Sequence, residues 1–177
     1  MRAAGGFLLG IIITLVVVGG GVWGYLKWGS LPVATSDKPF PLEAQIVRIP
    51  MHARIKHDMI QPPFAGNEQV YEAGAQIYAR QCASCHGVPG HDVAFARWMY
   101  PHAPQLWKKH GKRGVVGVSD DEPGETYWKV QNGIRLTGMP AYQHVLSDEQ
   151  MWDVTMLLKA ADQPLSPQVS AELTPKP

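Results

Sequence analysis

The chain has 177 residues, 45% of them hydrophobic, and a formal net charge of +1. This length is enough for one modest domain, and the near-neutral charge argues against a nucleic-acid partner. The chain has only two cysteines, which are too few for a four-thiolate metal cluster.

The first predicted element is an apolar segment near the N-terminus. Residues 5–26 contain no charged side chain. About 20 such residues in a helix cross a hydrocarbon layer of about 30 Å. Trp23 and Trp28 lie toward the far end of this segment, where aromatic rings prefer the headgroup level. We therefore expect a short cytoplasmic N-terminus over residues 1–6 and a transmembrane anchor over residues 7–28.

A cleaved secretory signal is the alternative to an anchor. The apolar part of such a signal usually spans about 7 to 15 residues before a small-x-small cleavage site. The apolar segment of this chain is longer, and no clear Ala-x-Ala sequence follows it closely. The length therefore favours an uncleaved anchor.

The next segment, residues 29–66, is rich in proline and has no sustained helical or strand period. It is expected to be a linker, extended in its proline-rich parts, with at most a short helical turn over residues 48–60. His52 and His57 lie in this segment, and linker histidines are more often solvated than bound to a metal. The prolines that define the linker are Pro32, Pro39, Pro41, Pro50, Pro62 and Pro63.

Three helices are predicted after the linker. Asn67 can cap a helix whose apolar residues recur every three to four positions as far as the first cysteine. A second helix over residues 124–132 is expected to end at Gly133, since glycine commonly follows the last helical residue. Ser147 and Gln150 form the sequence of a capping box, which opens a third, broadly apolar helix.

The predicted domain, residues 67–162, is therefore all-α. Between its first two helices the sequence is rich in glycine, proline and charge, with at most a short helical piece over residues 92–99. A domain of this size buries only a small core unaided, and a central cofactor would add apolar area. Residues 163–177 contain four prolines and are expected to form a disordered tail.

The central motif is Cys82-Ala83-Ser84-Cys85-His86. A C-x-x-C-H sequence indicates covalent heme attachment, in which the two thiols bond to the vinyl groups and the histidine binds the iron. A thioredoxin-like redox pair would follow a β-strand, whereas the residues before Cys82 predict a helix. A zinc site would lack further ligands nearby. Cys82, Cys85 and His86 are therefore the predicted heme-binding residues.

The sixth iron position decides between electron transfer and ligand chemistry. Met139 is the candidate ligand, because Gly138 lets the chain pass close to a macrocycle and Pro140 stiffens the loop. His102, which has Pro101 before it, is the strongest competing ligand. Four histidines would allow a bis-histidine heme in place of a His/Met heme, namely His91, His102, His110 and His144.

On these motifs the segment 67–162 resembles a class I, monohaem cytochrome c of bacterial type. The resemblance implies a small fold of about three to four helices around one covalent heme c, here preceded by a single transmembrane helix. Pro104-Gln105-Leu106 is similar to the Pro-x-Leu sequence of the family, and implies a hydrogen bond from His86 Nδ1 to the Pro104 oxygen. Trp128 is expected to line the heme pocket.

The resemblance also concerns the crossing of the terminal helices. Gly74 and Tyr78 in the first helix and Trp152 in the last helix match the family's helix-crossing contact. Glycine inside a helix costs about 1 kcal/mol relative to alanine, so close approach of the two helices is the physical reason to keep it.

The function that the resemblance implies is a membrane-anchored electron carrier, not an enzyme, with its heme domain on the periplasmic side of a bacterial cytoplasmic membrane. Its expected partners are redox proteins. The basic residues within Lys108–Arg113 are interpreted first as a solvated loop, and the alternative is that they attract an acidic redox partner. A fixed subunit of a respiratory oxidase, reductase or dehydrogenase complex is the alternative. A heme sensor or peroxidase with a labile Met139 is a third interpretation.

Overall fold

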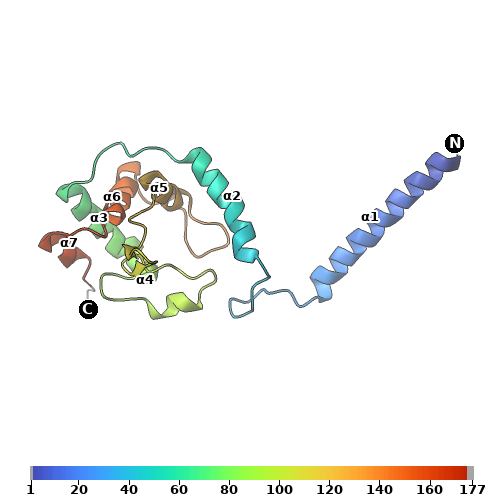
Figure 1. Ribbon diagram of the computed structural model, residues 1–177, viewed down its shortest axis with the longest axis horizontal. Helices are drawn as coiled ribbons and strands as arrows, with labels where there is room; N and C mark the ends of the chain where they lie inside the picture. The colour runs from blue at the N-terminus through green and yellow to red at the C-terminus, as the bar shows by residue number, and fades with distance from the viewer. Residues whose placement is uncertain (1, 175–177) are drawn as a thin grey trace. The chain divides into compact units, whose positions relative to one another are not determined.

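The computed structural model describes residues 2–174 and divides into two compact units at residue 40 (Figure 1). The first unit contains α1 (Arg2–Trp28), and the second contains all the other helices and strands. The described part of the chain is mainly helical, as the sequence predicts. Each unit is described by itself below.

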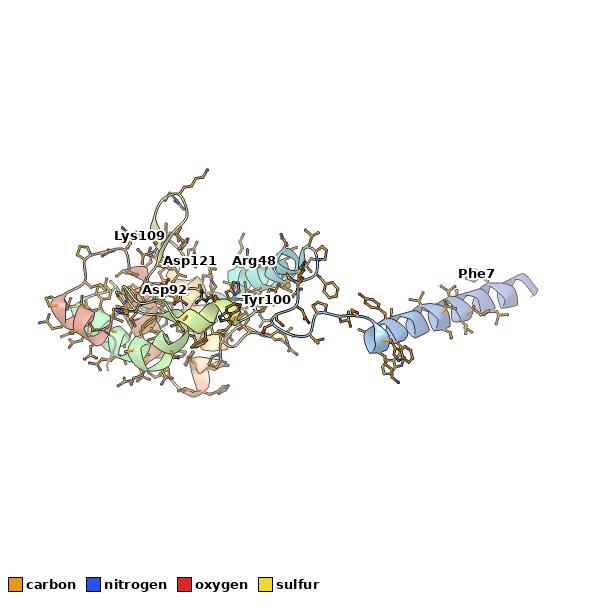
Figure 2. All side chains as sticks on the ribbon, turned by 90° about the horizontal axis from the view of Figure 1, so that it is seen from below. Phe7, Arg48, Asp92, Tyr100, Lys109 and Asp121 are labelled. Carbon is orange, nitrogen blue, oxygen red and sulfur yellow. The ribbon has the colours of Figure 1, made fainter. Side chains whose placement is uncertain are left out.

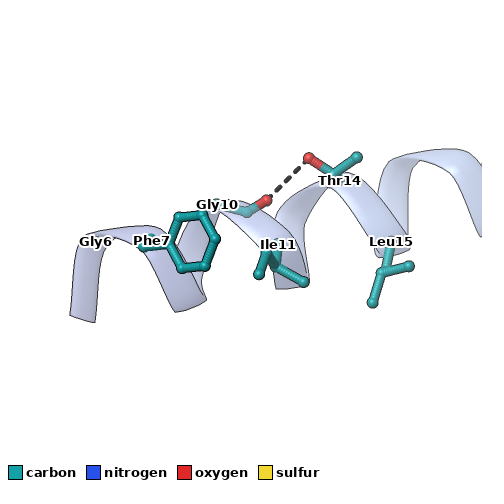
Figure 3. Close-up of a pocket in the computed structure, with 6 residues that line it drawn as sticks. All are labelled: Gly6, Phe7, Gly10, Ile11, Thr14 and Leu15. Carbon is teal, nitrogen blue, oxygen red and sulfur yellow. Dashed lines mark hydrogen bonds between the residues drawn. The ribbon is translucent and has the colours of Figure 1, made fainter. Parts of the chain in front are cut away.

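Apolar side chains cover α1 on all sides. Phe7, Leu15 and Val16 are each about two-thirds exposed, although a helix of a soluble domain would bury such residues on one face. Figure 3 shows Phe7, Ile11 and Leu15 in succession along the helix, and the Thr14 hydroxyl donates a hydrogen bond to the carbonyl one turn earlier. Among the described residues, Gly5–Trp28 is the helix whose length and composition suit a membrane span.

Three helices form the core of the second unit. α3 (Glu68–Gln81) crosses α6 (Asp148–Lys159), and α5 (Pro123–Asn132) packs against α6. The crossing is close because Gly74 has no side chain. A Cβ at Gly74 would come within 2.4 Å of the Asp153 carbonyl oxygen, so even alanine would force the helices apart. The predicted role of Gly74 is confirmed.

The predicted helix caps are also present. The Asn67 side chain accepts a hydrogen bond from the Val70 N–H at 3.1 Å. Ser147 and Gln150 form a complete capping box at the start of α6. Gly133 follows α5 with φ of 66°, a left-handed value that favours glycine.

Two pairs of aromatic rings lie in the core, beside the predicted helix crossing. Trp152 of α6 stacks on Tyr127 of α5, with ring centroids 4.1 Å apart and an interplanar angle of 11°. Tyr78 of α3 instead meets Trp107 edge to face, with centroids 5.7 Å apart. The first pair joins α6 to α5, and the second joins α3 to the loop at residue 107.

α2 (Glu43–Asp58) lies where an extended linker was expected, and it corrects that prediction. The helix continues through Pro50, although proline lacks the N–H that would bond to the carbonyl one turn earlier. Packing on α5 offsets this loss, because Ile55 is 2% exposed and the Ile60 carbonyl lies against Gly124. A Cβ at Gly124 would come within 2.4 Å of that oxygen. The prolines of this segment led to the prediction of a linker, whereas tertiary contacts stabilise a helix there.

α7 (Pro167–Glu172) corrects the prediction of a disordered tail. Ser166 caps this helix by accepting a hydrogen bond from the Val169 N–H, and Pro167 occupies its first turn, where its missing N–H costs nothing. Val169 and Leu173 are buried in the core, and α7 packs against α3. The part of the predicted tail over residues 175–177 lies outside the described residues.

Short elements connect α3 to α5. They are α4 (Ala83–His86), the 3-10 helix η1 (Ala94–Trp98) and the two-residue strands β1 (Lys109–His110) and β2 (Val115–Val116), which pair antiparallel. A second 3-10 helix, η2 (Tyr142–His144), precedes α6. Figure 2 shows Lys109 on the hairpin of β1 and β2, which projects from the second unit.

Candidate functional site

The two cysteines and the histidine lie in one tight turn. α3 ends at Gln81, and the carbonyl of the next residue, Cys82, accepts hydrogen bonds from the N–H groups of Cys85 at 3.1 Å and His86 at 2.9 Å. This turn forms α4 and brings the predicted heme-binding residues to one end of the core. Both thiols are free.

The surroundings of the thiols differ from those of a redox pair of the thioredoxin type. Helix α3, not a strand, precedes Cys82. Burial, with a smaller contribution from the nearby Cys85, raises the pKa of Cys82 to about 12. A reactive cysteine of a C-x-x-C motif has a lowered pKa instead. Among residues 2–174, no group of three or more His, Cys, Asp or Glu side chains is arranged to hold a metal ion.

In the His86 ring, Nδ1 makes a hydrogen bond and Nε2 is available to bind a metal ion. Its Nδ1 lies 2.8 Å from the Pro104 carbonyl oxygen, which is the predicted hydrogen bond. Burial lowers the pKa of His86, against a smaller opposite effect of the Pro104 bond. A neutral imidazole that donates from Nδ1 presents the lone pair of Nε2, as an iron ligand must.

Two buried tyrosines hold the backbone on either side of the motif. The Tyr78 hydroxyl donates to the Gly87 carbonyl at 2.7 Å, and the Tyr142 hydroxyl donates to the Gln81 carbonyl at 2.7 Å. Burial raises the pKa of both tyrosines, that of Tyr142 to about 12, so both remain protonated donors at neutral pH. The sequence analysis predicted neither bond, and the partners of the second are 61 residues apart.

Met139 lies in a loop that is held mainly by its own neighbours. The Thr137 hydroxyl accepts a hydrogen bond from the Met139 N–H at 3.1 Å and donates to the Ile134 carbonyl at 2.7 Å. A Cβ at Gly133 would come within 2.8 Å of the Met139 oxygen, so the loop folds back closely on the end of α5. Met139 is partly buried and packs against the same hydrophobic core as Cys82.

One competing ligand remains near this loop. A Cβ at Gly138 would come within 2.9 Å of the Met99 methyl carbon, and the Met99 carbonyl is 2.7 Å from His102 Nδ1. His110 is less available, because its Nε2 lies 2.6 Å from the Gly117 carbonyl. His102 is thus a competing histidine that lies near the Met139 loop, and Met139 remains the predicted ligand.

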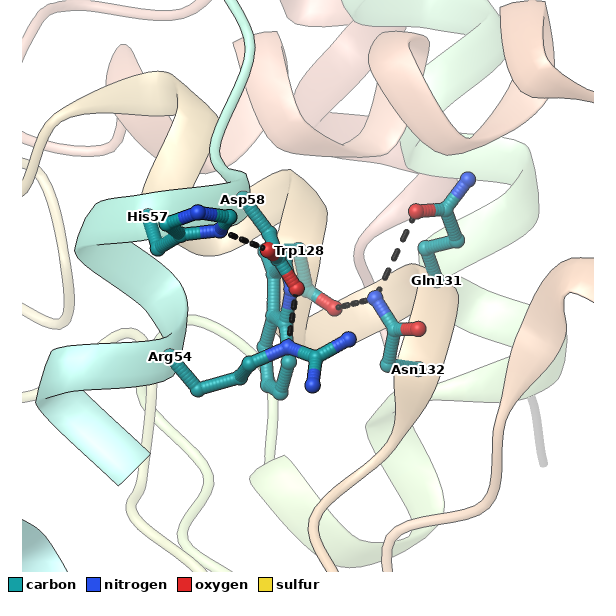
Figure 4. A network of polar contacts seen from close by, with 6 residues as sticks. All are labelled: Arg54, His57, Asp58, Trp128, Gln131 and Asn132. Atoms are coloured by element: carbon teal, nitrogen blue, oxygen red, sulfur yellow. Dashed lines mark hydrogen bonds and ion pairs between the residues drawn. The ribbon is translucent and has the colours of Figure 1, made fainter. Parts of the chain in front are cut away.

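Trp128 is turned toward α2. Figure 4 shows its ring beside Asp58, whose carboxylate also receives hydrogen bonds from His57 and Arg54. These bonds lower the pKa of Asp58 to about 2, with His57 as the largest cause and the Trp128 side chain as the smallest. The Trp128 carbonyl accepts a hydrogen bond from the Asn132 side chain. Trp128 therefore ties α5 to α2, and its place in the heme pocket stays a prediction.

The donor set fits a covalently attached heme. The two thiols, three positions apart, could bond to two vinyl groups, the His86 imidazole could bind the iron, and the partly buried thioether of Met139 could supply a second iron ligand. The predicted attachment residues Cys82 and Cys85, the ligand His86 and its partner Pro104 are brought together by the contacts above. Met139 shares their hydrophobic core.

Comparison with known families gives one match. Residues 69–156, about half of the chain, match the family model described as cytochrome C oxidase, cbb3-type, subunit III. The match begins within α3 and ends within α6, so it covers the motif, the Pro104 loop and the Met139 loop. No curated protein matches the chain.

Proposed function

Because residues 69–156 form a class I monohaem cytochrome c domain that carries one covalent heme c, we propose that this electron carrier is anchored to a bacterial cytoplasmic membrane by α1 and shuttles single electrons between redox proteins. In this proposal Cys82 and Cys85 attach the cofactor, and His86 and Met139 bind its iron. The bound heme supplies the reversible one-electron couple. The protein residues hold the ligands and exclude water from them.

The observation that carries the proposal is the hydrogen bond from His86 Nδ1 to the Pro104 oxygen. A histidine whose Nδ1 donates to the Pro104 oxygen has the tautomer that leaves Nε2 available to an iron ion, and burial lowers the pKa of this ring. The ring lies one residue after Cys85, so attachment and ligation use the same turn. A thioether on the other face would favour electron transfer over binding of small ligands, because it fills the sixth position.

The anchor proposal is supported by the length and exposure of α1. A helix of 27 residues spans about 40 Å at 1.5 Å per residue, which is enough for a bilayer core. Attachment of heme c takes place outside the cytoplasm in the resembled family, and this favours the periplasmic side for residues after Trp28. The described cysteines are partly buried and unpaired, as covalent attachment requires.

The test uses the full chain expressed in a bacterium that attaches heme c. We expect the heme to stay with the polypeptide on a denaturing gel, the protein to resist alkaline extraction from membranes, and the oxidised form to show the far-red sulfur-to-iron charge-transfer band. Release of the protein by alkaline extraction would contradict the anchor. Absence of the far-red band together with rapid carbon monoxide binding would support a sensor or peroxidase instead.

A second candidate function follows from the description of the matched family, which is that of an oxidase subunit. In this alternative the chain keeps its carrier chemistry and is a fixed subunit of a respiratory oxidase, reductase or dehydrogenase complex. Extraction of native membranes in mild detergent followed by sizing separates the two. A shuttle elutes near the size of the chain with its detergent, whereas a fixed subunit elutes with the subunits of a larger complex.

A further inference from the structure

Gln105 makes three hydrogen bonds to the backbone around His86. Its Nε2 donates to the Cys85 carbonyl at 3.1 Å and to the Ala103 carbonyl at 3.2 Å, and its Oε1 accepts from the Val93 N–H at 2.7 Å. The two carbonyls and the one N–H fix which end of the amide is which, and both Nε2 hydrogens are used. Gln105 thus cross-links three backbone groups of this region through its side chain.

The two carbonyls that accept from Nε2 belong to the residues just before His86 and Pro104. Cys85 immediately precedes His86, and Ala103 immediately precedes Pro104, so the amide bridges the residues before each partner of the His86–Pro104 hydrogen bond. On the other side of that bond, the Leu106 N–H donates to the His86 carbonyl at 3.0 Å. The bond that orients the imidazole is therefore enclosed between two cross-links.

The chain admits the amide at close range because Gly87 has no side chain. A Cβ at Gly87 would come within 2.6 Å of Gln105 Oε1, and the φ of 72° at this position also favours glycine. Pro104 itself belongs to no helix or strand, so its carbonyl has no regular structure to hold it in place. The side chain of the next residue provides that support.

We propose that Gln105 is a positioning residue for the iron ligand: it holds the Pro104 carbonyl against His86 Nδ1 and thereby sets the orientation and electron-donating strength of the imidazole. This inference rests on the proposed role of His86. A weaker bond at Nδ1 makes the imidazole less basic and less able to stabilise ferric iron, so loss of Gln105 should raise the reduction potential.

The experiment compares variants of the full-length heme protein in detergent. Gln105→Met removes all three hydrogen bonds at similar length, whereas Gln105→Glu keeps the acceptor for Val93 and loses both donor bonds. The readouts are exchange of the His86 Nδ1 proton, followed by NMR, and the reduction potential. We expect exchange about tenfold faster in both variants, since each loses the bridge, and a raised potential in Gln105→Met.

The matched control is Gln150→Met, which removes a glutamine bond to the backbone in the capping box of α6 and should change neither readout. Unchanged exchange and potential in Gln105→Met would overturn the inference. So would exchange in Gln105→Glu at the unaltered rate, because Gln105 would then serve only the Val93 loop. If Gln105→Met carries no heme, Gln105→Asn replaces it, with the same expected direction and the same refuting result. Failure of the proposed function would show instead in the unaltered chain, as a missing His/Met spectrum.

Discussion

The two sides of the candidate ligand axis are held in different ways. Around His86 the bonds join distant parts of the chain, since Pro104 is 18 residues away and the Tyr142 bond to Gln81 spans 61 residues. Around Met139 the two bonds of Thr137 and the bond from the Ile134 N–H to the Met139 carbonyl reach at most five residues along the chain. A loop held locally can open without unfolding the rest of a domain, whereas a segment cross-linked over long separations cannot. We therefore expect the histidine side to be part of the fold and the methionine side to be the labile one.

The largest expected effect is that of His86→Ala. The variant loses both the iron ligand and the bond to Pro104, and a small domain that depends on a cofactor for its core has little stability to spare. We expect little or no folded heme protein, measured by heme staining and circular dichroism of the purified full chain. His144→Ala, at an exposed position of η2, is the control and should behave as the parent. A normal heme spectrum in His86→Ala would contradict the comparison.

Gly74→Val tests the helix crossing behind the histidine side. The new side chain would collide with the Asp153 carbonyl, which belongs to the backbone and cannot move aside cheaply. Overpacking of this kind costs about 3 kcal/mol at the upper end of its usual range. Urea unfolding of the variant should show this loss in free energy of unfolding. Gln76→Val, exposed on the same helix, introduces the same residue type without a clash and should cost far less.

Met139→Ala should leave the heme attached and open its sixth position. We expect the far-red band to disappear, carbon monoxide to bind the reduced protein, and the free energy of unfolding to fall by about 2 kcal/mol, the low end for a buried methionine, since Met139 is only partly buried. Met99→Ala is the control, since Met99 contacts the same loop at Gly138. Retention of the band in Met139→Ala and its loss in Met99→Ala would reassign the ligand to Met99, whereas a parent protein without the band that gains carbon monoxide binding in His102→Ala would reassign it to His102.

A pair of single-atom changes sharpens the contrast between the two sides. Tyr142→Phe and Thr137→Val each remove a hydroxyl that bonds to the backbone, and each should reduce the free energy of unfolding by about 1 kcal/mol. Only Thr137→Val should weaken the far-red band, because its bond holds the Met139 loop. Absorption spectra recorded on warming measure this difference. Equal weakening in both variants would show that the methionine loop is not held locally.

The smallest expected effect is a change in the free energy of unfolding on substitution of Asp153 in α6. Burial, and to a lesser degree the neighbouring Glu149, raise the pKa of Asp153 in the folded protein. A raised carboxyl pKa adds stability only below the unfolded value of about 3.9, and this contribution is lost as the pH rises through the folded pKa. Asp153→Asn should therefore be more stable than the parent at pH 7, by less than about 1 kcal/mol, and this advantage should vanish near pH 3.5. Thermal unfolding at both pH values measures it, and a less stable variant at pH 7 would contradict the assignment.

The sequence was sufficient for the elements whose signals are local. Capping residues and helical spacing identified α3, α5 and α6, because a cap and its first turn lie within four residues of each other. The C-x-x-C-H motif identified the heme-attachment turn for the same reason. The His86–Pro104 bond was predicted only through the family resemblance, since nothing in the spacing of the two residues requires it.

The remaining features depend on contacts between distant segments. α2 contains a proline and has no side-chain cap, and it is stable because Ile55 is buried and Gly124 admits the chain at Ile60. α7 has only six residues and is held by Val169 and Leu173 in the core. Local propensity predicts neither helix, because tertiary packing decides both. The Gln105 bridge was missed because it needs the three-dimensional path of the loop.

The docking of α2 also limits the range of the proposed carrier. Only residues 29–42 separate α1 from α2, and a fully extended chain of that length reaches no more than about 50 Å. A tether this short keeps a heme domain within a thin layer next to the bilayer and raises its effective concentration for acceptors embedded there. By packing on the heme domain, α2 would thus shorten the flexible tether. The domain would search a smaller volume and would meet membrane-embedded acceptors more often.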